Sequence, residues 1–189
     1  MLKKISLAMA FGLLFSLAPC VDGTALAAPF SCQPPALITS AGQSMEVKMV
    51  SMVCKKIGLA NECDSLATPS MLSGKKTLII VPGVSLKGMG TAGVDIGAEN
   101  SRIAQLCAKA RQQGIKVVLV HTGGTIRRGP VNDPVIEETL AGADVVVVCK
   151  EGNQDQFFTT QCRKRNIPMI EIANISDLPK TLKALFQID

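Results

Sequence analysis

Uninterrupted apolar runs that alternate with helix-like segments constrain this chain more than any other feature. The runs TLIIV, KVVLV and VVVV begin at residues 77, 116 and 145, and shorter runs lie at 36–40 and 167–173. The segments between them carry apolar residues three and four positions apart, and glycines such as Gly58 and Gly114 end them. Apolar strands that alternate with amphipathic helices predict βαβ units around a parallel sheet that is buried on both faces.

We therefore expect a three-layer α/β fold with an open parallel sheet of five strands and helices on both faces, of flavodoxin-like or Rossmann-like type. The chain is too short for the eight units of a closed barrel. Strand order 2-1-3-4-5 is our first prediction, because doubly wound sheets use it. Ser44 is expected to cap the first of five helices, which are predicted at residues 45–57, 98–113, 134–143, 157–166 and 176–186.

The first residues have the pattern of a secretory signal peptide. Lys3 and Lys4 precede an apolar run at 5–18, and small residues follow at Ala25 and Ala27. We expect cleavage after Ala27, a short extension at 28–35 and a single domain at 36–189. The protein is then exported, either periplasmic or secreted, with no membrane-spanning segment in the mature chain. The alternative is a lipoprotein anchored through Cys20.

Composition argues against nucleic-acid binding. The net charge of +5 is mild and falls to about +4 once the two Lys and one Asp of the signal peptide are removed. The chain has no Trp and no Tyr, so the aromatic platforms that usually accompany basic nucleic-acid surfaces are missing.

Six cysteines follow the predicted cleavage point, and an even number in an oxidising compartment favours disulfides. Cys54 and Cys63 are the pair we predict first, because the helix end at Gly58 lets the chain double back between them. Buried, unbonded cysteines are the alternative. No metal site is predicted, since no cysteine pair has ligand spacing and His121 is the only histidine.

Three Gly-rich loops follow predicted strands, at 40–44, 83–93 and 121–129. The carboxyl ends of parallel strands meet at one edge of the sheet, where ligands bind at the point at which the winding reverses. Loop glycines expose backbone N–H groups to anions, and arginine binds carboxylate or phosphate through two hydrogen bonds. The predicted ligand-binding residues are Ser44, Lys87, Gly88, Gly90, His121, Gly123, Gly124, Arg127 and Arg128.

Ordinary structural roles compete with these assignments. The loops can simply turn corners with their arginines in solvent, and His121 can cap a strand end. Asp95 and Glu99 are expected to complement a helix dipole. The chain has neither GxxxxGK[ST] nor a GxGxxG after its first strand, so we predict no cofactor.

The string TGGTI at 122–126 resembles the nucleophile motif of asparaginases, in which Thr125 would attack an amide. Here the string follows the third predicted strand instead of the first, Arg127 replaces a small residue, and the second motif of that family is missing. We interpret the match as coincidental. A hydrolase that uses Thr125 or Ser85 with His121 is retained as an alternative.

A broader resemblance covers residues from about Ala36 to Phe186. The strings ALITSAGQS, SLKGMGTAG, HTGGTIRRG and EGNQDQFFT resemble an exported bacterial family known as domain of unknown function 6305. The resemblance implies the alternating α/β layout, a signal peptide and the position of a site, but no reaction or ligand. Our hypothesis is binding of a small anion at the carboxyl edge of the sheet. A periplasmic protein-interaction module is the alternative.

Overall fold

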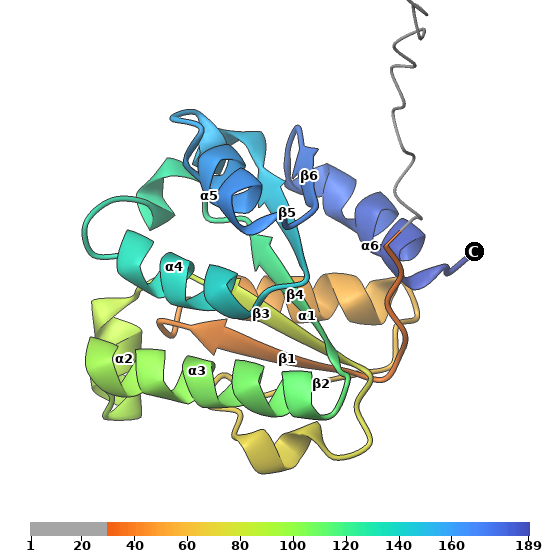
Figure 1. The fold of residues 1–189 in the computed structure, drawn as a ribbon, viewed down its shortest axis with the longest axis horizontal. Helices are drawn as coiled ribbons and strands as arrows, with labels where there is room; N and C mark the ends of the chain where they lie inside the picture. The colour runs from red at the N-terminus through yellow and green to blue at the C-terminus, as the bar shows by residue number, and fades with distance from the viewer. Residues whose placement is uncertain (1–29) are drawn as a thin grey trace, which may run out of the picture.

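The computed structural model describes residues 30–189, and six strands within them form one all-parallel sheet (Figure 1). The predicted signal peptide lies outside the described residues. The strands are β1 (Ala36–Ala41), β2 (Asn61–Cys63), β3 (Thr77–Pro82), β4 (Lys116–His121), β5 (Val145–Cys149) and β6 (Met169–Ile172). Their order across the sheet is β2-β1-β3-β4-β5-β6. The α/β class is therefore confirmed.

The prediction of five strands is wrong by one. The additional strand, β2, has only three residues, which pair with Ala36, Leu37 and Ile38 of β1. Its sequence, Asn-Glu-Cys, lacks the apolar run by which strands were identified. The strand predicted as the second is β3, which lies between β1 and β4. The order 2-1-3-4-5 predicted for the five apolar strands is therefore wrong: they follow one another in chain order across the sheet, and β2 is added beside β1. The winding therefore reverses between β1 and β3, and the loops that follow these two strands flank the reversal.

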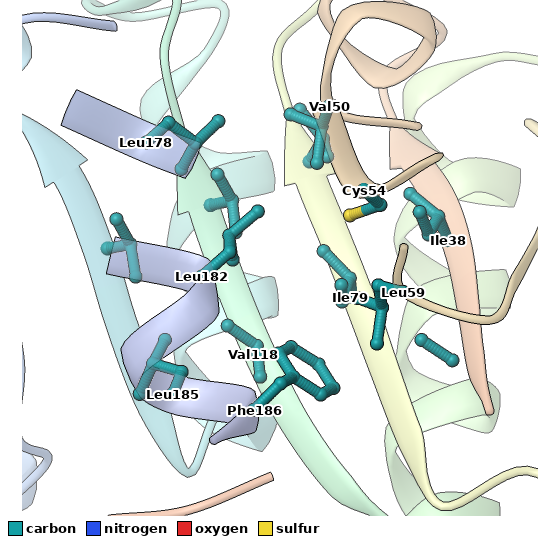
Figure 2. Close-up of a cluster of buried hydrophobic side chains, with 14 of the residues drawn as sticks. Ile38, Val50, Cys54, Leu59, Ile79, Val118, Leu178, Leu182, Leu185 and Phe186 are labelled. Atoms are coloured by element: carbon teal, nitrogen blue, oxygen red, sulfur yellow. The ribbon is translucent and has the colours of Figure 1, made fainter. Parts of the chain in front are cut away.

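Helices cover both faces of the sheet. On one face, α1 (Glu46–Lys56) and α6 (Leu178–Phe186) pack on strand residues such as Ile38, Ile79 and Val118 (Figure 2). On the other face, α3 (Ile96–Gln112), α4 (Asp133–Gly142) and α5 (Phe157–Arg165) bury Ile103, Leu140 and Phe158, and Met89 of α2 (Leu86–Ala92) joins the same side. The three layers agree with the sequence-based expectation.

The alternation of side chains along each strand divides the core. In β3, Ile79 and Val81 point to the α1 and α6 side, whereas Leu78 and Ile80 point to the α3 side, and all four are fully buried. Each such side chain contributes roughly 1.5–3 kcal/mol by leaving water. Central strands of this kind need apolar residues on both faces, which explains the continuous runs in the sequence.

Five predicted helices occur within two residues of their expected ends, and one was missed. Residues 86–92 form α2, inside the stretch predicted as a long Gly-rich loop. Ser85 starts this helix by accepting a hydrogen bond from the Gly88 N–H. Ser44 does not cap α1 as predicted, because Met45 occupies the cap position and makes no side-chain cap.

All six cysteines of the described chain are free thiols, so the predicted Cys54–Cys63 disulfide is not present in the structure. Cys54 is fully buried on α1, and burial together with the neighbouring Cys63 raises its pKa to about 12. In residues 30–189 no helix has the length and apolarity to span a bilayer.

Candidate functional site

The loops after β1 and β3 are joined to each other across the point where the winding reverses. The Gly83 N–H donates to the Ala41 carbonyl at 2.8 Å, and the Ser85 N–H donates to the Gly42 carbonyl at 2.7 Å. Gly42 has a φ of 101°, and a Cβ there would lie 2.6 Å from the Gly83 oxygen. Only glycine permits this close approach of the two loops.

Gln43 adopts a left-handed backbone with a φ of 60°, which is costly for a residue with a side chain. Its side-chain Nε2 donates to the Ser65 carbonyl and to Glu99 Oε1, both at 2.9 Å. Glu99 Oε1 also accepts the Gly42 N–H at 2.7 Å. The buried carboxylate of α3 therefore fixes the strained loop after β1.

Arg102 completes this support. Its Nε donates to Glu99 Oε2 at 2.9 Å, and its Nη atoms reach Glu99 Oε1, Thr39 Oγ1 and the carbonyls of Ser40 and Ala67. Burial alone would raise the pKa of Glu99, but the hydrogen bonds and the charge of Arg102 outweigh it and hold this pKa below its ordinary value. Glu99 is thus an ionised, fully bonded group, which its predicted role at a helix dipole did not anticipate.

Arg127 ties three loops together from the 3-10 helix Gly124–Arg127 that follows β4. Its Nε donates to Glu46 Oε1 at 2.7 Å, at the start of α1 just behind the loop after β1, and its Nη1 donates to the Val84 carbonyl at 2.8 Å, in the loop after β3. The side chains of Arg127 and Glu46 remain 23% and 20% exposed. Burial acts to raise the pKa of Glu46, but hydrogen bonding to Arg127 lowers it overall. The pair is ionised and reachable from solvent.

Several buried polar atoms near Arg127 lack a hydrogen-bond partner among the described residues. Three of them are Ser44 Oγ, Glu46 Oε2 and Thr122 Oγ1, and His121 Nδ1 is a fourth. They lie in the loop after β1 and at the end of β4, the two segments that Arg127 joins. A buried polar atom without a partner costs about 1–3 kcal/mol, so such a cluster at one sheet edge requires an explanation.

The Arg128 guanidinium makes ion pairs, a backbone hydrogen bond and an aromatic contact within the protein. Its guanidinium contacts Asp133 and Asp155 at 2.8 and 2.9 Å, and its Nη1 donates to the Gly152 carbonyl. It also stacks 4.2 Å from the Phe157 ring centroid. Arg128 therefore connects the loops after β4 and β5, and both predicted anion-binding arginines make contacts within the protein.

His121 is fully buried and stands 4.9 Å from the Phe158 ring. Its Nε2 donates to the Arg127 carbonyl at 3.2 Å, which leaves Nδ1 as the unpaired acceptor. Burial lowers the pKa of His121 to about 4. The ring hydrogen-bonds to neither Thr125 nor Ser85, and the Ser85 hydroxyl is used as the α2 cap. The geometry does not assemble the nucleophile and base of the hydrolase alternative.

The remaining predicted residues differ in how closely they pack. Lys87 is exposed in α2, and Gly90 of the same helix has open space beside it. A Cβ at Gly123 would lie 2.1 Å from the Arg127 side chain, so glycine lets the Arg127 stem cross the loop. Gly88 and Gly124 are similarly crowded, by the Gln43 carbonyl and by Glu151.

Sequence reasoning missed Glu46, Glu99 and Thr122. Glu46 stands two positions after Ser44, directly behind a strand-end loop, and this position was the available signal. Glu99 and Arg102 are three positions apart on one helix, a spacing common on exposed helix faces, and the distant partners Gly42 and Gln43 left no local signal. Among residues 30–189 no group of His, Cys, Asp and Glu side chains is arranged to hold a metal ion.

Comparison with known proteins gives a family but no characterised relative. Neither the curated proteins nor the solved structures yield a match. The family model described as "Domain of unknown function (DUF6305)" matches residues 33–186. The match includes every strand and helix of the described chain and the group of Ser44, Glu46, His121, Thr122 and Arg127, here called the Arg127 cluster. The chain therefore belongs to the DUF6305 family.

Proposed function

We propose that this protein binds a small carboxylate-bearing or phosphate-bearing ligand at the carboxyl edge of its sheet, between the loops after β1, β3 and β4. The observation that carries the proposal is the set of unpaired buried oxygens beside Arg127, namely Ser44 Oγ, Glu46 Oε2 and Thr122 Oγ1. A ligand that pairs with them removes their cost from the complex, which is a source of binding free energy.

The chemistry of these groups narrows the ligand. Arg127 uses Nε and Nη1 within the protein, and its Nη2 makes no hydrogen bond among residues 30–189. A carboxylate or phosphate oxygen is the natural acceptor for this N–H group. Glu46 Oε2, in contrast, needs a donor such as an ammonium or hydroxyl group. A small anion that also carries a donor, as an amino acid does, satisfies both ends of the ion pair.

The fold supports this position. We infer a flavodoxin-like winding, in which strand order begins 2-1-3-4-5 and ligands bind where it reverses. Here the reversal lies between β1 and β3, beneath Gly42 and Gly83. The strained Gln43 backbone beside it is of the kind that clusters at ligand sites.

A thermal-shift screen tests the proposal. Residues 28–189 are screened against inorganic phosphate, small carboxylates, amino acids and nucleotides. A ligand at a hundred times its Kd adds about 2.7 kcal/mol to stability, which raises Tm by several degrees. The double variant Ser44→Ala with Thr122→Val keeps the fold but removes two ligand contacts, so we expect it to lose the shift. The matched control is Ser73→Ala with Thr160→Val, which changes two exposed residues.

The result that contradicts the proposal is equally specific. If the double variant shifts as much as the unchanged protein, the ligand binds elsewhere. If no compound of any class produces a shift, the unpaired oxygens are closed to ligands and the small-ligand function fails.

A second candidate, a protein-interaction module, is favoured by the exposed apolar side chains at the same edge. Six of the seven exposed large hydrophobic residues in the described chain follow the carboxyl ends of strands, and the most exposed are Met45 at 72%, Leu86 at 72% and Ile126 at 80%. Exposed apolar clusters mark interaction surfaces. Leu86→Gln with Ile126→Gln should abolish a stoichiometric complex with a partner protein, whereas Met52→Gln, on the outer face of α1, should not.

We further propose that the protein is exported. The basis is the signal-peptide pattern at 1–27. Mass spectrometry of the protein recovered from its native compartment should show a chain that begins at Ala28. A lipid-modified Cys20 at the amino terminus supports the lipoprotein alternative instead, and an intact Met1 excludes both.

A further inference from the structure

An open apolar groove is lined mainly by residues of β6 and α6 and by no residue of the carboxyl-edge site. Figure 1 shows where these two elements lie in the fold. The groove volume is about 740 Å³, within the range of pockets that bind small organic molecules. The groove is lined mainly by apolar side chains, with a few polar ones at its sides: Phe30, Val145, Pro168, Ile170, Ile172, Ala173, Ala184 and Leu185, together with Glu171, Asp177, Lys180 and Thr181.

The groove exists because α6 covers only part of the sheet. Leu178, Leu182 and Leu185 of α6 are buried in the same cluster as residues of β4 and β5 (Figure 2). The edge strand β6 lies beyond them, and its Ile170 remains only partly buried on this side. Phe30 forms another wall of the groove and packs against the same cluster. An apolar strip of the sheet is thus open to solvent between two rigid elements.

The charged groups of the groove are not equally available. Glu171 accepts a hydrogen bond from Asn153 Nδ2 at 2.8 Å, and Asp177 accepts one from the Asn174 N–H as part of a capping box. Lys180 is exposed and forms no ion pair within residues 30–189. Both acidic side chains remain part of the lining, each with one hydrogen bond from the fold, and Lys180 is the one basic group of the lining and is free to pair with an anionic head group.

The neighbouring helix α1 also carries positive charge on this face of the sheet. Helix α1 contacts α6 on this face of the sheet, and its exposed charged residues are Lys48, Lys55 and Lys56. None of these three lysines forms an ion pair among the described residues. An anionic molecule therefore approaches a face whose free charges on α1 and α6 attract it.

We propose that this groove binds the acyl chain of an anionic amphiphile, with Lys180 paired to the anionic head group. The apolar lining accommodates the hydrocarbon chain, and the free ammonium selects carboxylate or phosphate over neutral and cationic heads. This site is separate from the Arg127 cluster and does not depend on the function proposed there.

Calorimetric titration of residues 28–189 with dodecanoate, below its micelle concentration, tests the assignment. Dodecanol and dodecylamine have the same chain with a neutral and a cationic head. We expect saturable one-to-one binding of dodecanoate, at least about tenfold tighter than either analogue. Lys180→Glu should reverse the order of dodecanoate and dodecylamine. Lys56→Glu, an exposed lysine of α1 outside the groove lining, is the control and should leave the order unchanged.

Ala184→Trp tests the groove itself. Ala184 is exposed and lines the groove, so a larger side chain should fill the space and abolish dodecanoate binding without lowering Tm. If Ala184→Trp binds dodecanoate normally, the groove is not the site and the proposal is overturned. Equal binding of all three twelve-carbon compounds overturns the role of Lys180.

Vesicles distinguish a free acid from a bilayer lipid as the source of the chain. Sedimentation with phosphatidylglycerol vesicles, compared with phosphatidylcholine vesicles, should retain the protein only if it takes its ligand from a membrane. Dodecanoate binding without vesicle binding identifies a free acid, and selective vesicle binding that Ala184→Trp removes identifies a lipid. Failure of both measurements overturns the proposal.

Discussion

Two arginine–glutamate pairs flank the loop after β1, and they differ in how completely their polar atoms are bonded. Arg102 and Glu99 lie beneath the loop, and each carboxylate oxygen of Glu99 has at least one partner. Arg127 and Glu46 lie at its end, where Glu46 Oε2 and the neighbouring Ser44 Oγ have none. The Arg102–Glu99 pair is fully hydrogen-bonded and holds the backbone of the loop in place. The second has the incomplete bonding that a ligand site has before its ligand arrives.

The largest expected loss of stability comes from breaking the Arg102–Glu99 pair. Arg102→Ala leaves the Glu99 charge fully buried without its cation, so we expect a loss of about 3–5 kcal/mol in the free energy of unfolding, measured by urea denaturation. Arg111→Ala, on the same helix but exposed, is the control and should change little. A loss below about 1 kcal/mol for Arg102→Ala would remove the distinction between the two pairs.

Acid sharpens the comparison through His121, whose Nε2 donates to the Arg127 carbonyl and whose Nδ1 lies unpaired beside Gly152. The pKa of His121 is about 4 in the folded protein and 6.5 when unfolded, so protons bind the unfolded chain first as pH falls. Stability should therefore decrease from about pH 6.5 to 4, by on the order of 3 kcal/mol in total. The carboxylates with lowered pKa lose their contribution only below about 4.5, so the upper part of this window isolates His121. His121→Gln should flatten the pH dependence there, and an unchanged slope would assign it to another group.

Removing Arg127 should cost less than removing Arg102. Its ion pair is partly exposed, so Arg127→Ala should lower the free energy of unfolding by on the order of 1–2 kcal/mol in urea denaturation. Arg127→Lys retains the charge but not the planar group that reaches both Glu46 and the Val84 carbonyl. Its free energy of unfolding should therefore lie between those of the unchanged protein and Arg127→Ala. Equal losses in the free energy of unfolding for Arg127→Ala and Arg102→Ala would mean that both ion pairs serve only to stabilise the loops.

The smallest effect is expected for Ser44→Ala. Its hydroxyl is buried without a partner, so its removal breaks no hydrogen bond and should leave the free energy of unfolding unchanged or raise it by about 1 kcal/mol. Thr39→Val removes a buried hydroxyl beside the Arg102–Glu99 pair. This hydroxyl accepts a hydrogen bond from Arg102 Nη1 and donates one to the Ser65 carbonyl. That variant should cost about 1–2 kcal/mol. Two equal values in the same denaturation experiment would contradict the comparison.

The sequence predicts the parts of the fold that follow from local pattern. The five apolar runs become β1, β3, β4, β5 and β6, because strands buried on both faces must be apolar throughout. The short β2 has no such run and is held by pairing with β1, which acts over long range. Helix α2 contains Gly88 and Gly90, and its composition therefore resembles a loop although Ser85 caps it.

The candidate site is predicted less completely, for a physical reason. Strand-end position predicts that Ser44, His121 and Arg127 gather at the carboxyl edge of the sheet, and the structure places all three there. Whether an arginine faces solvent or a carboxylate depends on tertiary contacts, such as those of Arg128 with Asp155 across 27 positions. No local pattern encodes those partners, so the sequence indicates which residues gather but not which of their atoms remain free.

The two ends of the described chain meet on the side of the sheet opposite the proposed site. The Cys32 N–H donates to the Leu185 carbonyl at the end of α6, and residues 32–35 lead into the amino end of β1 (Figure 1). A surface that holds the protein at residues 30–32 or at Asp189 therefore contacts the edge of the sheet opposite the proposed site. Immobilised in this way, the Arg127 cluster and Ile126 face outward, and the orientation requires no engineering.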